Sequence, residues 1–276
     1  MSEPEMQTVA VIGAGTMGGG IASICLQSGL DVNLFDPDGT ARERTKERVA
    51  KRSPAEALEA RFKVFDQLAA ACATADFVIE AVPELLDLKR EIFRELDAIT
   101  PERTILATNT SELSVTAIAA ATQRPDRVIG MHWFNPPERM LLIEVVRGLE
   151  TSDATSRATR RLAERCGKTT VTVADRQGFV TTRALAALLG EAVRMLEEGV
   201  ATAEDIDTAV KLGLNHPMGP LELADYVGLD TVLYISDAMT DAMGERFRAA
   251  QTLRKLVEAG RLGRKSGHGF YRYHDS

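Results

Sequence analysis

The amino-acid sequence predicts an α/β fold, in which a doubly wound, mostly parallel sheet is followed by an all-α C-terminal domain. Short apolar runs alternate with longer segments of helical periodicity over residues 8–173, the pattern of a parallel sheet with crossover helices. After Asp175 the strand-like runs disappear and only helical periodicity remains. With 276 residues, 45% of them hydrophobic and 26% charged, the chain is long enough for two compact domains without disulfides or structural metals. We expect the domains to be residues 1–177 and 178–276.

The individual elements follow from these patterns in chain order. The predicted strands are residues 8–12, 31–35, 61–65, 75–79, 104–107, 127–131, 141–146 and 169–173. Between them, the periodicity predicts helices at 17–28, 39–60, 85–99, 113–120 and 155–166. The all-α part is predicted to contain helices at 183–198, 203–212, 220–227, 229–243 and 253–259, with Thr202 as the cap of the second.

Composition excludes several classes of function. The net charge of −7 offers no electrostatic footprint for nucleic acid or an anionic membrane. No apolar run approaches the ~18–20 residues that cross a bilayer, and the polar, acidic N-terminus is unlike a signal peptide. Cys25, Cys72 and Cys166 form no CxxC pair and the four histidines show no ligand spacing, so we expect no metal site. Reduced thiols of this kind are typical of a cytoplasmic protein.

A glycine motif follows the first predicted strand and opens the first helix. Gly13, Gly15 and Gly18 have the GxGxxG spacing that binds a dinucleotide. The first glycine permits a tight turn, the second lets the backbone approach a pyrophosphate, and the third allows close packing of helix and strand. Thr16 and Met17 complete the loop, and the pyrophosphate is expected at the positive end of the helix that follows. Glycines in a strand–turn–helix can also serve packing alone.

Asp36 indicates which dinucleotide is bound. It lies 18 residues after Gly18, at the end of the second predicted strand, where a carboxylate accepts hydrogen bonds from the ribose hydroxyls. A carboxylate there repels a 2′-phosphate, and the next residue, Pro37, cannot neutralise one. The sequence therefore favours NAD over NADP as cofactor.

His132 is the candidate base for interconverting an alcohol and a carbonyl. It lies near the end of a predicted strand, and the stretch 136–139 that follows has the composition of a turn. If the chain doubles back near residue 138, Glu144 returns opposite His132 and can fix the tautomer of the imidazole. A histidine beside a glutamate is also common as a structural pair, so the pair alone leaves both interpretations open.

Several long motifs in order carry a family resemblance over essentially the whole chain. They are VIGAGTMGGGIA (11–22), VIEAVPE (78–84), ATNTSELSVT (107–116), RVIGMHWFNPP (127–137), IEVVRG (143–148), GVATAEDID (199–207), HPMGPLELADYVGLDT (216–231) and AGRLGRKSGHGFYRY (259–273). The sequence resembles the 3-hydroxyacyl-CoA dehydrogenase family in its short, 3-hydroxybutyryl-CoA dehydrogenase form. The resemblance implies a Rossmann-like NAD-binding domain, an all-helical domain that forms a homodimer, and an active site in the cleft between them. It also implies an acyl-thioester substrate, CoA-linked, and a role in fatty acid metabolism.

The resemblance also implies residue roles. His132 is the general base, Glu144 is its partner, and Ser111 donates a hydrogen bond to the reacting oxygen. Ser111 is also a candidate N-cap of the helix at 113–120, and the two roles can coexist. The residues implied on the nicotinamide-ribose side, or in ordering the His132 loop beside it, are Glu84, Lys89, Asn109 and Asn135.

Three positions depart from the family pattern. Thr182 occupies the place of a catalytic asparagine and offers one hydroxyl donor in place of an amide. Glu112 replaces a serine beside Ser111, and the stretch 37–61 is shorter than the family arm that contacts the nucleotide of CoA. These departures leave two alternatives open. One is a dehydrogenase of a carrier-protein-bound or free hydroxy acid, and the other is a non-catalytic NAD-binding relative.

Overall fold

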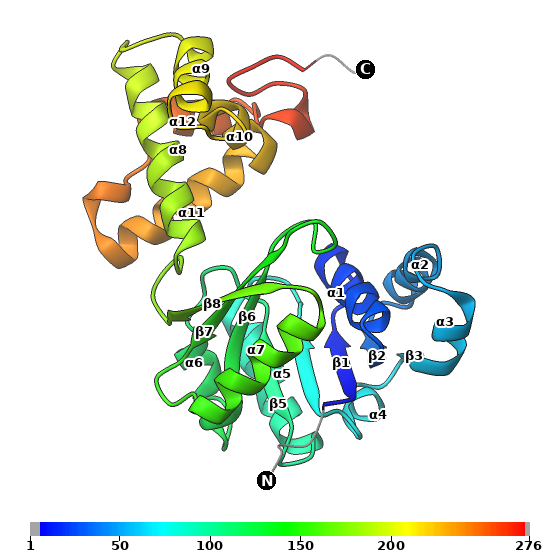
Figure 1. Ribbon diagram of the computed structural model, residues 1–276. Coiled ribbons are helices and arrows are strands. Elements are labelled where there is room, and N and C mark those ends of the chain that lie inside the picture. The colour runs from blue at the N-terminus through cyan, green and yellow to red at the C-terminus, as the bar shows by residue number, and fades with distance from the viewer. Residues whose placement is uncertain (1–5, 274–276) are drawn as a thin grey trace. The chain divides into compact units, whose positions relative to one another are not determined.

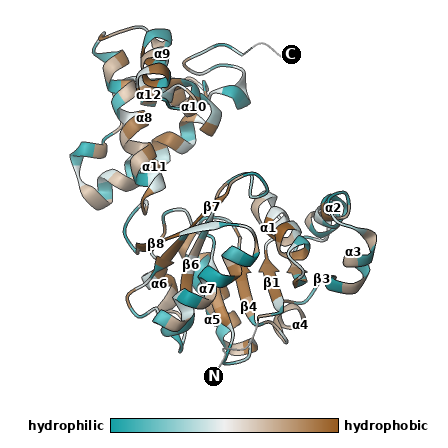
Figure 2. Cartoon of the chain, viewed as in Figure 1, coloured by the Kyte–Doolittle hydropathy of each residue, from teal (hydrophilic) through white to brown (hydrophobic). Residues whose placement is uncertain are grey.

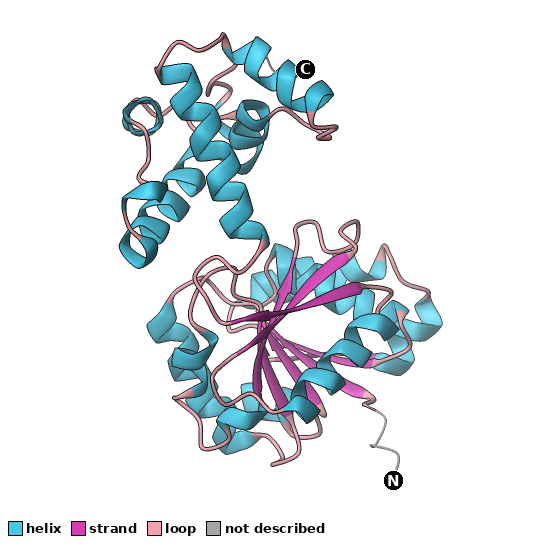
Figure 3. Cartoon of the chain, turned by 60° about the vertical axis from the view of Figure 1, so that its left-hand side comes forward, coloured by secondary structure: helices cyan, strands magenta, loops and turns pink. Residues whose placement is uncertain are grey.

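The computed structural model describes residues 6–273, and its contacts divide the chain into two compact units. The first unit extends to Phe179 and contains all the strands among the described residues. The second unit starts at Val180 and is built from helices (Figure 3). The α/β class followed by an all-α part is thus confirmed.

An eight-stranded sheet forms the centre of the first unit (Figure 1). Its strands are β1 (Thr8–Ile12), β2 (Asp31–Phe35), β3 (Phe62–Phe65), β4 (Phe77–Glu80), β5 (Ile105–Thr108), β6 (Val128–Trp133), β7 (Leu142–Arg147) and β8 (Thr169–Ala174). The spatial order is β3-β2-β1-β4-β5-β6-β7-β8, and only β7 on β6 pairs antiparallel. All eight predicted strands are present, with ends shifted by two residues at most.

Helices cover both faces of this sheet. They are α1 (Thr16–Gln27), α2 (Gly39–Ala50), α3 (Ala55–Arg61), α4 (Leu68–Cys72), α5 (Leu86–Ile99), α6 (Val115–Ala119), α7 (Asp153–Arg165) and the 3₁₀ turn η1 (Pro125–Arg127). Side chains of β1 alternate between the faces: Val9 and Val11 pack in the cluster of α1, α2 and α7, whereas Ala10 and Ile12 pack in that of α4, α5 and α6. The buried strands are accordingly apolar on both sides (Figure 2).

The prediction of one helix over 39–60 was wrong. The segment contains α2, which Asp38 caps by accepting a hydrogen bond from Thr40 N, and a separate α3. Pro54 separates them, because proline has no N–H to donate and disfavours helical backbone at the residue before it. The 37–61 stretch therefore contains two short helices.

The second unit packs its helices around an apolar core of its own. These are α8 (Thr181–Glu197), α9 (Ala203–Gly213), α10 (Pro220–Val227), α11 (Leu229–Met243), α12 (Gln251–Glu258) and the 3₁₀ turns η2 (Glu245–Phe247) and η3 (Arg264–Ser266). Thr202 caps α9 by accepting from Asp205 N, as predicted. Asp225, 1% exposed, accepts from the backbone N–H groups of Phe270 and Tyr271 and so fixes the C-terminal tail. Within residues 6–273, none of the helices combines the length and apolar character needed to cross a membrane.

Candidate active site

The candidate residues of the first unit lie at or near the carboxyl edge of the parallel strands. The register places Ile12, Glu80, Thr108 and Gly130 side by side on β1, β4, β5 and β6, so the residues that follow them share one edge. The neighbours of β1 are β2 on one side and β4 on the other, so the strand order reverses its direction at this strand. Dinucleotides bind at such a switch point, outside the carboxyl ends of the strands.

Two glycines of the GxGxxG motif are required by packing. Gly13 has φ +106°, and a Cβ there would lie 2.6 Å from the carbonyl oxygen of Ala81. A Cβ on Gly18 would lie 1.8 Å from the carbonyl oxygen of Gly13. Any side chain at either position would collide with backbone, so only glycine allows the loop to pack this closely against the residues after β4 and against α1.

The middle glycine has a different environment. A Cβ built on Gly15 meets no protein atom within 4 Å, so the loop is open on its outer side. Gly15 is the N-cap residue of α1 and is exposed together with Thr16, while Met17 is partly exposed. Free N–H groups and the positive dipole end of α1 thus face open space, and this arrangement fits the pyrophosphate of a dinucleotide.

Asp36 lies beside this loop, directly after β2. Its Oδ2 accepts a hydrogen bond from Ala14 N at 2.7 Å and its Oδ1 accepts one from Asp38 N at 2.9 Å. The guanidinium of Arg42 donates to the carbonyl oxygens of Asp36 and Pro37. The carboxylate therefore stands next to the glycine loop, where an adenosine ribose of NAD would lie, and the neighbouring arginine is engaged with the backbone.

His132 and Glu144 form a buried pair. The antiparallel register of β6 and β7 places them directly opposite each other, which confirms the predicted return strand. Glu144 is 0% exposed and its Oε2 lies 2.8 Å from Nδ1 of His132. The aromatic rings of Phe134 and Phe179 lie with their centroids 4.4 and 5.8 Å from that of the imidazole. With Nδ1 bound to the carboxylate, Nε2 is the nitrogen available to exchange a proton.

Ser111 lies in the turn after β5. It is exposed, and its backbone N–H donates to Oε1 of Glu84 at 2.7 Å. The alternative role of Ser111 as a helix cap is wrong, because Ser114 caps α6 by accepting from Ala117 N. The hydroxyl of Ser111 is therefore not needed to begin that helix.

The cofactor-side residues separate into exposed and buried ones. Asn135 is exposed at the start of the turn that follows β6, whereas Asn109 accepts a hydrogen bond from Trp133 N through its Oδ1. Lys89 is 1% exposed and ion-paired with Glu80, a residue that sequence reasoning did not single out. The apolar run of β4 is continuous and gives no signal for a buried glutamate at its end.

Thr182 and Glu112 are both buried. Thr182 is the second residue of α8, in the helical unit, and is 9% exposed. Glu112 is 4% exposed in the turn after Ser111. The effect of each substitution on turnover remains a prediction.

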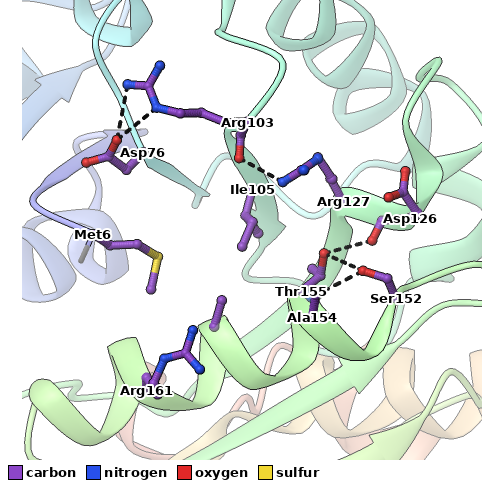
Figure 4. Close-up of a pocket in the computed structure, with 11 residues that line it drawn as sticks. Met6, Asp76, Arg103, Ile105, Asp126, Arg127, Ser152, Ala154, Thr155 and Arg161 are labelled. Carbon is purple, nitrogen blue, oxygen red and sulfur yellow. Dashed lines mark hydrogen bonds and ion pairs between the residues drawn. The ribbon is translucent and has the colours of Figure 1, made fainter. Parts of the chain in front are cut away.

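A cavity of 490 Å³ lies at the opposite edge of the sheet (Figure 4). Its walls come from the amino ends of β5 and β6 and from α7, and sequence reasoning did not predict it. Arg103 is paired with Asp76, and Arg127 donates to the carbonyl oxygen of Arg103 (Figure 4). The side chains of Asp76, Arg103 and Arg127 thus have partners within the protein. The cavity lies far from the glycine loop and from His132, at the other edge of the sheet.

The cysteines and the possible metal ligands of the described residues form no further candidate site. Cys25, Cys72 and Cys166 are buried and free, and burial raises the pKa of Cys72 to about 12. Among residues 6–273, no group of three or more His, Cys, Asp or Glu side chains is arranged to hold a metal ion.

Comparison with known proteins agrees with this geometry. The family described as 3-hydroxyacyl-CoA dehydrogenase, NAD binding domain, matches residues 8–176, and its C-terminal domain matches residues 178–273. A probable 3-hydroxybutyryl-CoA dehydrogenase of Bacillus subtilis is 45% identical, covering 98% of this chain and 99% of the relative.

Solved structures show the same relationship. The (S)-3-hydroxybutyryl-CoA dehydrogenase PaaH1 of Ralstonia eutropha has a TM-score of 0.94 and 41% identity, covering 98% of this chain and 100% of that one. A diketoreductase has a TM-score of 0.85 and 32% identity, covering 98% and 100%. The chain is an NAD-dependent oxidoreductase and belongs to the 3-hydroxyacyl-CoA dehydrogenase family.

Proposed function

We propose that this protein interconverts short-chain (S)-3-hydroxyacyl-CoA and 3-ketoacyl-CoA, with His132 as general acid and base. The observation that carries the proposal is the buried His132–Glu144 pair at the carboxyl edge that also holds the glycine loop. The short acyl chain is supported by the names of the relatives, which are 3-hydroxybutyryl-CoA dehydrogenases.

The residues divide the chemistry among them. Nε2 of His132 removes the proton of the C3 hydroxyl as the alcohol is oxidised, and Glu144 stabilises the imidazolium that results. The hydroxyl of Ser111 donates a hydrogen bond to the C3 oxygen and stabilises its alkoxide character. Bound NAD supplies the acceptor for the hydride that leaves C3. Asp36 and the loop of Gly13, Gly15 and Gly18 would hold its adenosine and pyrophosphate.

The test is consumption of NADH with acetoacetyl-CoA, followed at 340 nm, with His132→Gln as the inactive control. We expect turnover by the unmodified protein and a loss of about 10²-fold or more in the variant. A protein that binds NADH but gives no turnover with acetoacetyl-CoA would contradict the proposal.

A second candidate substrate is a free dicarbonyl compound or hydroxy acid. It is favoured by the likeness to a diketoreductase, and the shortened 37–61 stretch and Thr182 are consistent with it. Parallel assays with acetoacetyl-CoA and ethyl acetoacetate distinguish the two. A kcat/KM higher for the ester than for the thioester would favour this second candidate.

We also propose that the protein is a homodimer and that it works in the cytoplasm. The helical unit exposes large apolar side chains at Val200, Leu212 and Leu214, which are 64%, 80% and 70% exposed, and burial between two copies would remove them from water. Light scattering after size exclusion measures the molecular mass of the protein in solution, and the mass of a single chain would contradict the homodimer.

The proposed location in the cytoplasm is supported by the three free cysteines, which are typical of a reducing compartment.

A further inference from the structure

A fully buried ion pair is connected to the turn that carries Ser111. Glu80, the last residue of β4, is 0% exposed, and Lys89, in the first turn of α5, is 1% exposed. Nζ of Lys89 lies 2.6 Å from Oε1 of Glu80. Burying two charges costs much of what their attraction returns, so such a pair is weak evidence of stabilisation. Its further contacts indicate what else it does.

Lys89 extends the pair to Glu84. Its Nζ lies 3.2 Å from Oε2 of Glu84 and 3.4 Å from the carbonyl oxygen of Val82. Together with Glu80, these acceptors match the three N–H groups of the ammonium. The orientation of the Glu84 carboxylate is therefore set from inside the protein.

Glu84 in turn holds the Ser111 turn. Its Oε1 accepts from the hydroxyl of Thr110 at 2.5 Å and from the backbone N–H of Ser111 at 2.7 Å. Glu84 is 31% exposed in its side chain, so this end of the chain of contacts reaches the surface where the cofactor and substrate are expected. A displaced Glu84 carboxylate would displace Ser111 as well.

Glu80 also acts on the strand of His132. Its Oε2 accepts from the hydroxyl of Thr108 at 2.6 Å, and its carbonyl oxygen accepts from Asn109 N at 2.8 Å. The side chain of Asn109 then accepts from the N–H of Trp133, the residue after His132, at 2.9 Å. The two branches from Glu80 thus end at the hydroxyl-bearing turn and beside the base.

We propose that Glu80 is a positioning residue for the dehydrogenase reaction, acting through Lys89 and Glu84 to set the place of Ser111 relative to His132. Lys89 is the link between the two carboxylates in this arrangement. The inference rests on the proposed function, because the positions that it fixes matter for hydride and proton transfer. Misplacement of reacting groups by ~1 Å can cost about 10²-fold in rate.

The primary variant is Glu80→Gln, which keeps the volume but removes the charge that faces Lys89. We expect kcat with acetoacetyl-CoA to fall by about tenfold or more while the Kd for NADH changes by less than about threefold. The matched control is Asp97→Asn, which breaks another largely buried ion pair of this unit, Asp97 to Arg124 at 2.7 Å, far from the site. It should lower Tm with kcat unchanged. An equal loss of Tm in Glu80→Gln with kcat unchanged would show a merely structural pair and overturn the proposal.

A second variant tests whether the contacts act as one unit. Glu84 is part-exposed, so Glu84→Gln is expected to fold even if Glu80→Gln does not. Each single variant should lower kcat, and the double variant should lose little more than the larger single loss, because both interrupt the same chain. Fully multiplicative losses would mean that the two residues act independently, against the proposal.

Hydrogen exchange provides a readout that does not depend on the reaction. The amides of residues 108–113 should exchange faster in Glu80→Gln or Glu84→Gln than in the unmodified protein, and at the original rate in Asp97→Asn. Unmodified protein that fails to reduce acetoacetyl-CoA would contradict the proposed function, yet faster exchange would still support the positioning of Ser111. Unchanged exchange in both glutamate variants overturns it.

Discussion

Oε2 of Glu144 lies 2.8 Å from Nδ1 of His132 because the antiparallel register of β6 and β7 sets these two residues directly opposite each other. Directly opposed residues project to the same face of a sheet, so their side chains meet without any long-range adjustment. The pair is 5% exposed at the histidine and 0% at the glutamate, and a rigid strand pair holds it in place. The tautomer of the base is thus determined by backbone topology.

Removing either partner should lower kcat far more than it weakens NADH binding. We expect His132→Gln and Glu144→Gln each to lose about 10² or more in kcat, within the range of general acid–base catalysis. The double variant should lose much less than the product of the single losses, because the two side chains act together. Steady-state kinetics and NADH fluorescence titration measure both quantities, and multiplicative losses would contradict the pairing.

Local patterns make the His132–Glu144 pair predictable from the sequence, but they do not predict the Glu80–Lys89 pair. The spacing of a strand, a turn at 136–139 and a return strand specifies which residue faces His132. Glu80 and Lys89 are nine residues apart and meet only because β4 is buried and α5 folds back onto it. Nothing in hydrophobic periodicity distinguishes a glutamate that ends a strand at the surface from one that is buried with a lysine. The strands are predictable because their apolar runs are continuous, whereas hydrophobic periodicity does not mark the break at Pro54 within a charged segment.

The glycine loop gives a prediction that separates folding from cofactor binding. Gly18→Ala places a Cβ 1.8 Å from the carbonyl oxygen of Gly13, and such overpacking costs about 1–3 kcal/mol. We expect Tm to fall by roughly 3–10 °C. Gly15→Ala meets only open space within 4 Å, so Tm should stay within about 2 °C while the Kd for NADH rises about tenfold or more. Calorimetry and fluorescence titration distinguish the two, and equal effects on Tm would refute this division of roles.

Asp36 should determine the choice between NADH and NADPH. Its carboxylate stands beside the glycine loop with Oδ2 bound to Ala14 N, and it would repel a 2′-phosphate. We expect kcat/KM to favour NADH by at least about tenfold, on the order of 1.4 kcal/mol. Asp36→Ala should reduce this preference. Equal rates with both cofactors in the unmodified protein would contradict the assignment.

The lowered pKa of Asp76 predicts that this residue contributes to the stability of the folded protein in a pH-dependent way. Burial raises its pKa, but hydrogen bonds from Gln7 N, Thr8 N and Arg103 outweigh burial and the pKa is lowered overall. Because the folded pKa lies below the unfolded value of about 3.9, the stabilisation is present above that value and is lost as the pH falls through the folded pKa. Solvent screening limits its size to the order of 1 kcal/mol.

Asp76→Asn is the variant that tests it. The free energy of unfolding of the variant should be lower than that of the unmodified protein at pH 7, and the difference should shrink below about pH 4. Asp87→Asn is the control, since the side chain of Asp87 is 94% exposed and its arginine partner lies 4.0 Å away. Urea titrations at pH 7, 5 and 3.5 measure the difference, and a gap that is independent of pH contradicts the prediction.

Replacing Thr182 by asparagine distinguishes an active site that is only slightly altered from one that is adapted to another substrate. The family resemblance places it where an asparagine acts, and a hydroxyl offers one donor in place of the two of an amide. If Thr182 replaces that amide imperfectly, Thr182→Asn should preserve or raise kcat with acetoacetyl-CoA. If the site is built for another substrate, the longer reach of the amide should lower activity on that substrate, because misplacement by ~1 Å can cost about 10²-fold. We expect the first result, because His132, Glu144 and Ser111 are all retained.

Thr181→Asn, the same change one residue earlier in α8, is the matched control and should leave kcat unchanged. The measurement is kcat and KM for acetoacetyl-CoA and for ethyl acetoacetate, after each form is shown to bind NADH. A loss of kcat with acetoacetyl-CoA in Thr182→Asn alone would mean that threonine is the residue that this substrate requires.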